Sequence, residues 1–145
     1  MSMEQFKYLH FDVRPNCRRL KEQEATLHFK SVGNTYYALT INQVVSNKLR
    51  AKGYVFAKVR VDNFTQDAFI VFVREEDNDT MNVRFSKSKD NCNAQIIGKS
   101  LIEWLCNWYG IDTTDGNERK TINIGENLSR VEDAVVFKLN KSLIK

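Results

Sequence analysis

Lysine and arginine residues form three short groups along the chain, and a further pair lies in an alternating stretch between two of them. Such side chains bind nucleic acid when the fold gathers them on one surface, because each contact neutralises a phosphate and releases a counterion. DNA is therefore the first candidate partner. A solvated surface is the commoner fate of any one group, and the sequence leaves both interpretations open. The predicted phosphate contacts are Arg14, Arg18, Arg19, Lys48, Arg50, Lys52, Lys58, Arg60, Arg84, Lys87 and Lys89.

Residues that could carry catalysis or bind a metal are scattered. His10 and His28 are far apart, and Cys17, Cys92 and Cys106 include no close pair. A zinc site needs several such ligands at short spacing, and a nucleophilic thiol needs a neighbour that activates it. The six glycines do not form a phosphate-binding loop. We therefore expect a non-enzymatic protein without a metal or cofactor.

Size and composition indicate a globular protein. The chain has 145 residues, of which 42% are hydrophobic, and a net charge of +4. These values suit one domain with a core of ordinary size, and a charge of this size is compatible with either nucleic-acid binding or simple solubility. No charged and then apolar leader opens the sequence, and no apolar run approaches the ~20 residues that a membrane span needs. Since the cysteines are also unpaired, we expect a cytoplasmic protein with no membrane partner.

Hydrophobic periodicity predicts the elements that must position the basic groups. Two helices are expected, because residues that cap helix starts precede each apolar run and a glycine follows it. The first lies between Asn42 and Gly53, and the second, with the broader apolar side, runs from Gly98 or Ser100 to Gly110. Strands are predicted over 6–13, 26–30, 36–41, 54–62, 68–73, 81–85, 94–97, 121–124 and 134–139.

This order of elements occurs twice. A shift of 56 positions places Leu27, Phe29, Ala38, Ile41 and Leu49 on Val83, Phe85, Ala94, Ile97 and Leu105, and after an insertion 67–71 aligns with 133–137. Units of about 50 residues cannot easily bury their own apolar faces, so two copies should pack together. We therefore predict an α+β fold in which two tandem β-β-α-β-β units form a pseudo-twofold, mostly antiparallel β core with two short helices.

The same alignment gives the expected organisation of the chain. An N-terminal strand and basic segment covers 1–26, the first unit 27–73 and the second unit 83–139, and residues 27–139 form one compact domain. The acidic run between the units, over 74–82, lacks the glycine and final glutamate of a calcium loop and is interpreted as a solvated linker. Residues 140–145 are a short tail.

The segments 37–49 with 55–73, and 95–105 with 122–139, carry a resemblance to a known family. A strand that enters a capped short helix and is followed by two strands resembles the AbrB/MazE-type swapped-hairpin fold of bacterial transcription regulators and antitoxins. Asn42 and Gly98 stand near the place of the family's usual proline, and Gly53-Tyr54 and the segment 110–118 replace its Gly-Asp turn. The resemblance implies that two modules interlock their hairpins and that the assembled face binds DNA through basic side chains.

These observations lead to two expectations about function. The first is a small non-enzymatic binding protein of bacterial or phage type, a DNA-binding regulator that contacts phosphates through basic loops. The second is a module for protein–protein interaction or assembly that has no role with nucleic acid. That module would bind a protein partner or associate with itself through an exposed sheet edge.

Overall fold

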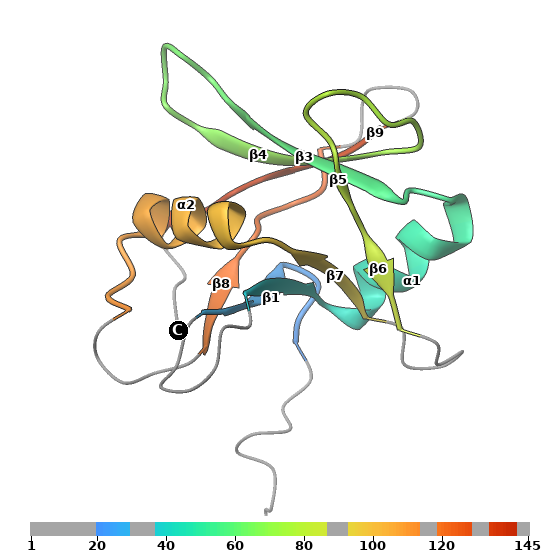
Figure 1. Ribbon diagram of the computed structural model, residues 1–145, viewed down its shortest axis with the longest axis horizontal. Coiled ribbons are helices and arrows are strands. Elements are labelled where there is room, and N and C mark those ends of the chain that lie inside the picture. Colours follow the sequence, from blue (N-terminus) through green and yellow to red (C-terminus); the bar gives the residue numbers. More distant parts are fainter. Residues whose placement is uncertain (1–19, 30–36, 87–92, 114–118, 129–133, 142–145) are drawn as a thin grey trace, which may run out of the picture.

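The computed structural model of the protein describes residues 20–29, 37–86, 93–113, 119–128 and 134–141 (Figure 1). The predicted strand over 6–13 lies outside these residues. Within them the chain forms nine strands and two helices. In chain order they are β1 (Glu24–His28), β2 (Ala38–Ile41), α1 (Gln43–Lys52), β3 (Phe56–Val61), β4 (Ala68–Val73), β5 (Met81–Asn82), β6 (Arg84–Phe85), β7 (Ala94–Ile97), α2 (Lys99–Tyr109), β8 (Arg119–Asn123) and β9 (Ala134–Lys138).

The strands form two antiparallel sheets, which confirms the predicted α+β class. One sheet has five strands in the order β6-β7-β2-β1-β8, and the other has four in the order β5-β3-β4-β9. Figure 1 shows the four-stranded sheet above the five-stranded one, with α2 and α1 toward opposite ends of the molecule. The chain passes from one sheet to the other several times, so neither sheet is built from one continuous segment.

The core lies between the two sheets, and residues of both sheets contribute to one buried cluster. From the five-stranded sheet, Leu27, Leu39 and Ile96 are at most 1% exposed. From the four-stranded sheet, Phe72 and Phe137 face them, and their rings meet edge to face with centroids 6.0 Å apart. Edge-to-face contact is a favoured geometry for aromatic pairs, so these two rings fix how β4 and β9 pack.

Helix α1 begins and ends as the sequence predicts. The Asn42 side-chain oxygen accepts a hydrogen bond from the Val45 amide at 2.9 Å, which satisfies one of the free amides of the first turn. At the other end Gly53 has φ of 76°, in the left-handed region, and the Tyr54 amide donates back to the Leu49 carbonyl at 3.0 Å. A residue with a side chain is strained in this conformation, which explains the glycine.

Helix α2 is the more buried of the two, as its apolar pattern predicts. Five of its residues are buried, against three in α1. Cys106, one of the five, is 5% exposed and packs as a small hydrophobic residue. Gly98 precedes the first residue of the helix, and no side chain caps it, so the predicted alternative cap, Ser100, lies within the first turn instead.

Several strand boundaries differ from the prediction, and three of the differences bear on the sheets. The strand expected over 81–85 divides at Val83, because β5 pairs with β3 in one sheet and β6 pairs with β7 in the other. The buried Val83 makes the connection, and its amide donates to the Val55 carbonyl. Strand β1 begins at Glu24 instead of residue 26, since its pairing with β8 starts there, and β8 begins two residues earlier than predicted, at Arg119.

The two strands after α2 do not form a hairpin like β3 and β4. Strand β8 pairs with β1 and β9 pairs with β4, so they belong to different sheets. Only isolated bridges, such as Asn123 with Asn140, link the two regions within the described residues. Among the residues that the structure describes, neither α1 nor α2 is long and apolar enough to cross a membrane.

Candidate nucleic-acid interface

The structure describes six of the eleven predicted phosphate contacts. Arg14, Arg18, Arg19, Lys87 and Lys89 lie outside the described residues. The other six lie on three elements, α1, β3 and β6, which belong to different parts of the fold. They are Lys48, Arg50, Lys52, Lys58, Arg60 and Arg84.

The three basic residues of α1 have structural roles that need no nucleic acid. Lys48 Nζ is 3.3 Å from Glu22 Oε1, in an ion pair whose members are both well exposed. Arg50 and Lys52 lie in the last turn of the helix. Cations are favourable there, because the carbonyl groups at the end of a helix carry partial negative charge.

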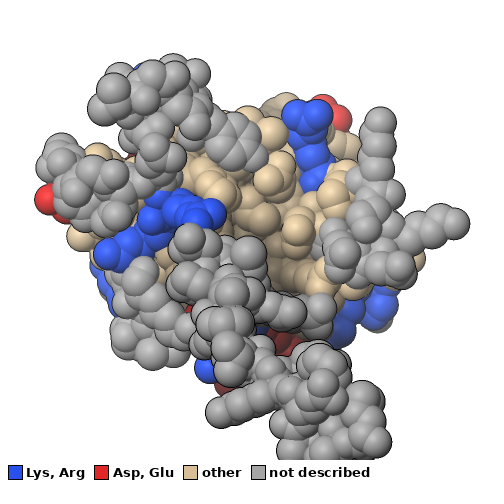
Figure 2. All heavy atoms as spheres, turned by 90° about the horizontal axis from the view of Figure 1, so that it is seen from below, with Lys and Arg blue, Asp and Glu red and all other residues tan. Residues whose placement is uncertain are grey.

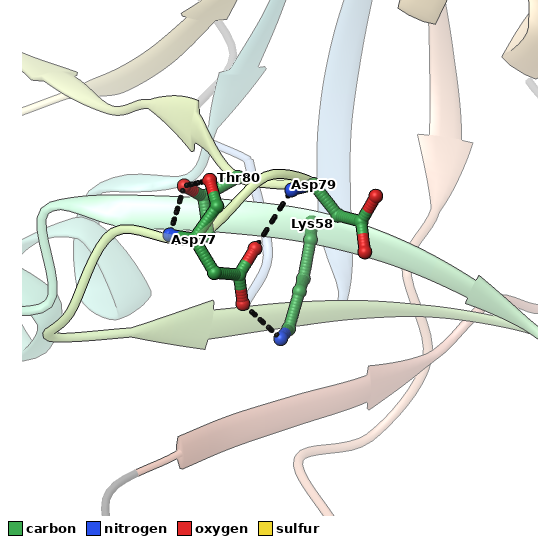
Figure 3. Close-up of polar contacts among 4 residues, drawn as sticks. All are labelled: Lys58, Asp77, Asp79 and Thr80. Carbon is green, nitrogen blue, oxygen red and sulfur yellow. Dashed lines mark hydrogen bonds and ion pairs between the residues drawn. The ribbon is translucent and has the colours of Figure 1, made fainter.

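Lys58 and Arg60 face outward from β3, as their alternation predicts, and both have partners there. Lys58 Nζ is 2.7 Å from Asp77 Oδ2 (Figure 3). This hydrogen bond and the amide of Asp79 lower the pKa of the Asp77 carboxyl. Arg60 stacks over the ring of Phe69, with its guanidinium carbon 4.9 Å from the ring centroid. The acidic segment thus neutralises part of the basic charge of the four-stranded sheet.

Arg84 belongs to a continuous line of polar side chains on the outward face of the five-stranded sheet. The Cα partners run from Arg84 to Gln95, then to Thr40, Thr26 and Thr121, with one residue from each strand. We call these five residues the polar row. The Gln95 side-chain amide donates to the Thr40 hydroxyl at 3.2 Å. Since side chains alternate along a strand, the row lies on the face opposite the buried leucines and isoleucines.

A second arginine, absent from the predicted set, joins this face. Arg119 opens β8 and is exposed, and its Cα partner on β1 is His28. Burial, and secondarily the charge of Arg119, lowers the pKa of His28, so the imidazole is neutral at pH 7. The alternation of Arg119, Thr121 and Asn123 in the sequence could have indicated that Arg119 faces outward from a strand. The strand predicted over 121–124 starts too late to include it.

Carboxylates are scarce on this face. Among the outward residues of the five strands in the described ranges, Glu24 alone is acidic; it is 5% exposed and accepts a hydrogen bond from the Lys21 amide at 2.9 Å. Neither Arg84 nor Arg119 forms an ion pair with a carboxylate of the described part. Figure 2, a view from the side of this sheet, shows Lys and Arg in separate groups around a tan centre with few acidic side chains between them.

Other kinds of site find no support within the part of the chain that the structure describes. No group of three or more His, Cys, Asp or Glu side chains there is arranged to hold a metal ion. Cys106 is buried, and burial followed by the charge of Glu103 raises the pKa of its thiol, the opposite of what an attacking thiolate needs. Comparison of the chain with models of protein families, with curated proteins and with solved structures gives no match.

Proposed function

We propose that this protein is a non-enzymatic DNA-binding regulator that contacts DNA through the outward face of its five-stranded sheet. The observation that supports this proposal is the polar row, which ends at Arg84 and lies beside Arg119, with no exposed carboxylate among the outward strand residues described. Arginine contacts phosphates or guanine edges, while threonine and glutamine donate to phosphates, sugars and base edges. Sheets are an established means of reading a DNA groove.

The dimensions of the row suit a duplex. Its five strands are separated by four spacings of ~4.8 Å, so the row spans about 19 Å. The major groove of B-DNA is about 12 Å wide. The arginines near the two edges of the sheet can therefore contact the backbones on either side of a groove while Thr26, Thr40 and Gln95 face its floor.

We also propose that the fold arose as a tandem repeat of the AbrB/MazE swapped-hairpin type. The strand pairing supports this, because β2 pairs antiparallel with β7, its counterpart under the shift of 56, and β4 pairs antiparallel with β9, its counterpart under the shift of 66 that aligns residue 67 with 133. The match is one of strand order and not of register, since Leu39 faces the core and its counterpart Gln95 faces outward.

The strands that follow the helices add to this support. Strand β8 of the second half lies beside β1 of the first, and β3 of the first half lies beside β5, which occupies the position equivalent to β1. Each half therefore gives a strand to the other, as in an interlocked pair of modules. The absence of a β8–β9 hairpin is the main departure from that pattern.

Fluorescence anisotropy with labelled duplex DNA of about 30 bp, at two salt concentrations, tests the DNA-binding proposal. We expect binding that weakens steeply with salt, since phosphate contacts release counterions. Replacing both Arg84 and Arg119 by alanine should weaken binding at least about tenfold and reduce the magnitude of the salt slope by about 2. Lys58→Ala, on the other sheet, is the matched control and should leave affinity within about twofold.

Two results would refute this proposal. The first is no binding to duplex or single-stranded DNA at low salt, which would favour the protein-interaction alternative. The second is equal loss of affinity in the Lys58→Ala control and the double arginine variant, since the face would then play no particular part.

A further inference from the structure

A pocket opens beside α2, next to the ends of β1 and β2. It has a volume of about 400 Å³, which suits a small organic molecule. The buried part of its wall is apolar, since Phe29, Ile102 and Cys106 line it and are each at most 5% exposed. Glu103 and Asn107 also line it and are exposed, so they form a polar rim. The pocket therefore suits a ligand with an apolar body and one polar end.

Glu103 gives this rim a negative charge. None of the described residues that line the pocket is a lysine or an arginine, although the chain as a whole is basic. The charge of Glu103 also acts on the buried wall, because it follows burial as the second cause of the raised pKa of the Cys106 thiol. A negative potential attracts cations and repels anions. The polar end of the ligand should therefore be positively charged.

The chain itself places an ammonium group at this rim. Lys99 Nζ lies 3.8 Å from Glu103 Oε1 and 6.0 Å from the centroid of the Tyr37 ring, which also lines the pocket. A carboxylate and the face of an aromatic ring both attract an ammonium group. Both distances are at the long limit for such contacts, and the side chains of Lys99 and Glu103 are 68% and 60% exposed. An ion pair this exposed contributes little to stability, so the cation of a ligand can replace Lys99 at small cost.

We propose that this pocket binds a small organic cation in which an amine is attached to an aromatic or apolar body. The ammonium of the ligand takes the place of Lys99 between Glu103 and Tyr37, and the apolar body packs against Phe29 and Ile102. Phe29 belongs to the core cluster between the sheets, whereas the polar row lies on the opposite face of the five-stranded sheet. The proposal therefore does not depend on DNA binding.

Titration of the nitrogen-15-labelled chain with tryptamine, followed by two-dimensional NMR near neutral pH, tests the proposal. Tryptamine joins an indole ring to a primary ammonium, and a ligand of this size should bind with a Kd on the order of 1 mM. The amide signals of Ile102, Cys106 and Ile111 should move together, while those of α1 should not. Tryptophol, which has a hydroxyl in place of the ammonium, should bind about threefold more weakly, the factor expected for an exposed ion pair. Indole-3-propionate, which has a carboxylate there, should bind more weakly still.

Two substitutions at the rim should change the affinity in opposite directions. Glu103→Gln should weaken tryptamine binding about threefold and leave tryptophol binding unchanged, because it removes only the charge. Lys99→Ala removes the competing ammonium and should strengthen tryptamine binding about twofold to threefold. Glu76→Gln, at an exposed carboxylate between β4 and β5, changes the net charge as Glu103→Gln does. It is the matched control and should leave the affinity unchanged.

Four results would each overturn the proposal. The first is that the signals of the pocket do not move at about 10 mM tryptamine, ten times the expected Kd. The second is that indole-3-propionate binds as tightly as tryptamine, and the third is that Glu103→Gln loses no more affinity than Glu76→Gln. The fourth is weaker tryptamine binding in Lys99→Ala, since Lys99 would then contact the ligand instead of competing with it.

Discussion

Replacing Asn42 by alanine should destabilise the protein by about 3 kcal/mol, because this one side chain joins α1 to the segment that leads into β1. Its oxygen caps the helix at the Val45 amide, and its amide group donates to the Glu22 and Glu24 carbonyls at 2.6 and 3.0 Å. Asn42 is 1% exposed, and its bonds to the Val45 amide and the Glu24 carbonyl are buried, while its bond to the Glu22 carbonyl is part-buried. In the alanine variant the two buried groups would therefore lose a hydrogen bond that water cannot readily replace.

The magnitude follows from these contacts. Loss of a cap typically costs about 1 kcal/mol, and a buried carbonyl that loses its donor costs about 1 kcal/mol or more. Asn42→Ser offers a partial control, because serine keeps the oxygen that caps Val45 but has no amide to reach both carbonyls. We expect Asn42→Ser to lose about 1–2 kcal/mol, between the wild type and Asn42→Ala.

Urea unfolding followed by the fluorescence of Trp104 and Trp108, both on α2, measures the difference. With a slope of about 2 kcal/mol/M, the alanine variant should unfold at a urea concentration lower by about 1.5 M. A loss below about 0.5 kcal/mol in Asn42→Ala would refute the structural role assigned to this residue. Wild-type stability in Asn42→Ser would show that the two carbonyl contacts contribute nothing.

Three further substitutions test other parts of the fold. The pKa of His28 is lowered in the folded protein, so the stabilising contribution of the neutral imidazole is complete above pH 6.5 and is lost as pH falls through the pKa of the folded state. In His28→Gln the free energy of unfolding should therefore change less with pH between about pH 7 and 5, as measured by urea titration at each pH. Tyr109→Phe removes a buried hydrogen bond of 2.6 Å to the Asn123 carbonyl and should cost about 1–2 kcal/mol by the same assay. Gly125 has φ of 73°, and an added Cβ would collide with the Lys138 carbonyl oxygen, so Gly125→Ala should lower Tm by several degrees or more; an unchanged Tm would contradict the close approach.

Local patterns predicted the elements well because local physics determines them. The side-chain cap at Asn42 and the glycine after each helix act within a few residues, and the structure confirms both. The alternation over β3 correctly predicts a strand, although Val55 and Val61 are exposed instead of buried. The burial of Cys106 was equally predictable from the sequence, because its neighbours define the apolar side of a helix. Predictions of this kind succeed when the deciding contacts are near in sequence.

Sheet order could not be predicted in the same way. Alternation over 81–85 indicates one strand, but pairing with β3 on one side and β7 on the other divides it at Val83. Likewise, the sequence places Lys58 and Arg60 among the basic residues but does not indicate that Asp77 and Phe69 contact them. Both outcomes depend on partners that are distant in the sequence, and no local pattern encodes them.

The polar row requires both halves of the chain, which constrains how any function of this face can work. Thr26 and Thr40 come from the first half, and the strands that carry them lie between β7 and β8 of the second half. Removing the first pair of strands would therefore separate the Arg84 edge of the sheet from the Arg119 edge. If the chain arose from two copies of a shorter module, its outward face became asymmetric after the fusion, because the positions that match Arg84 and Gln95 in the first half hold His28 and Leu39. A fused chain can specialise one face in this way, whereas a homodimer must change both copies at once.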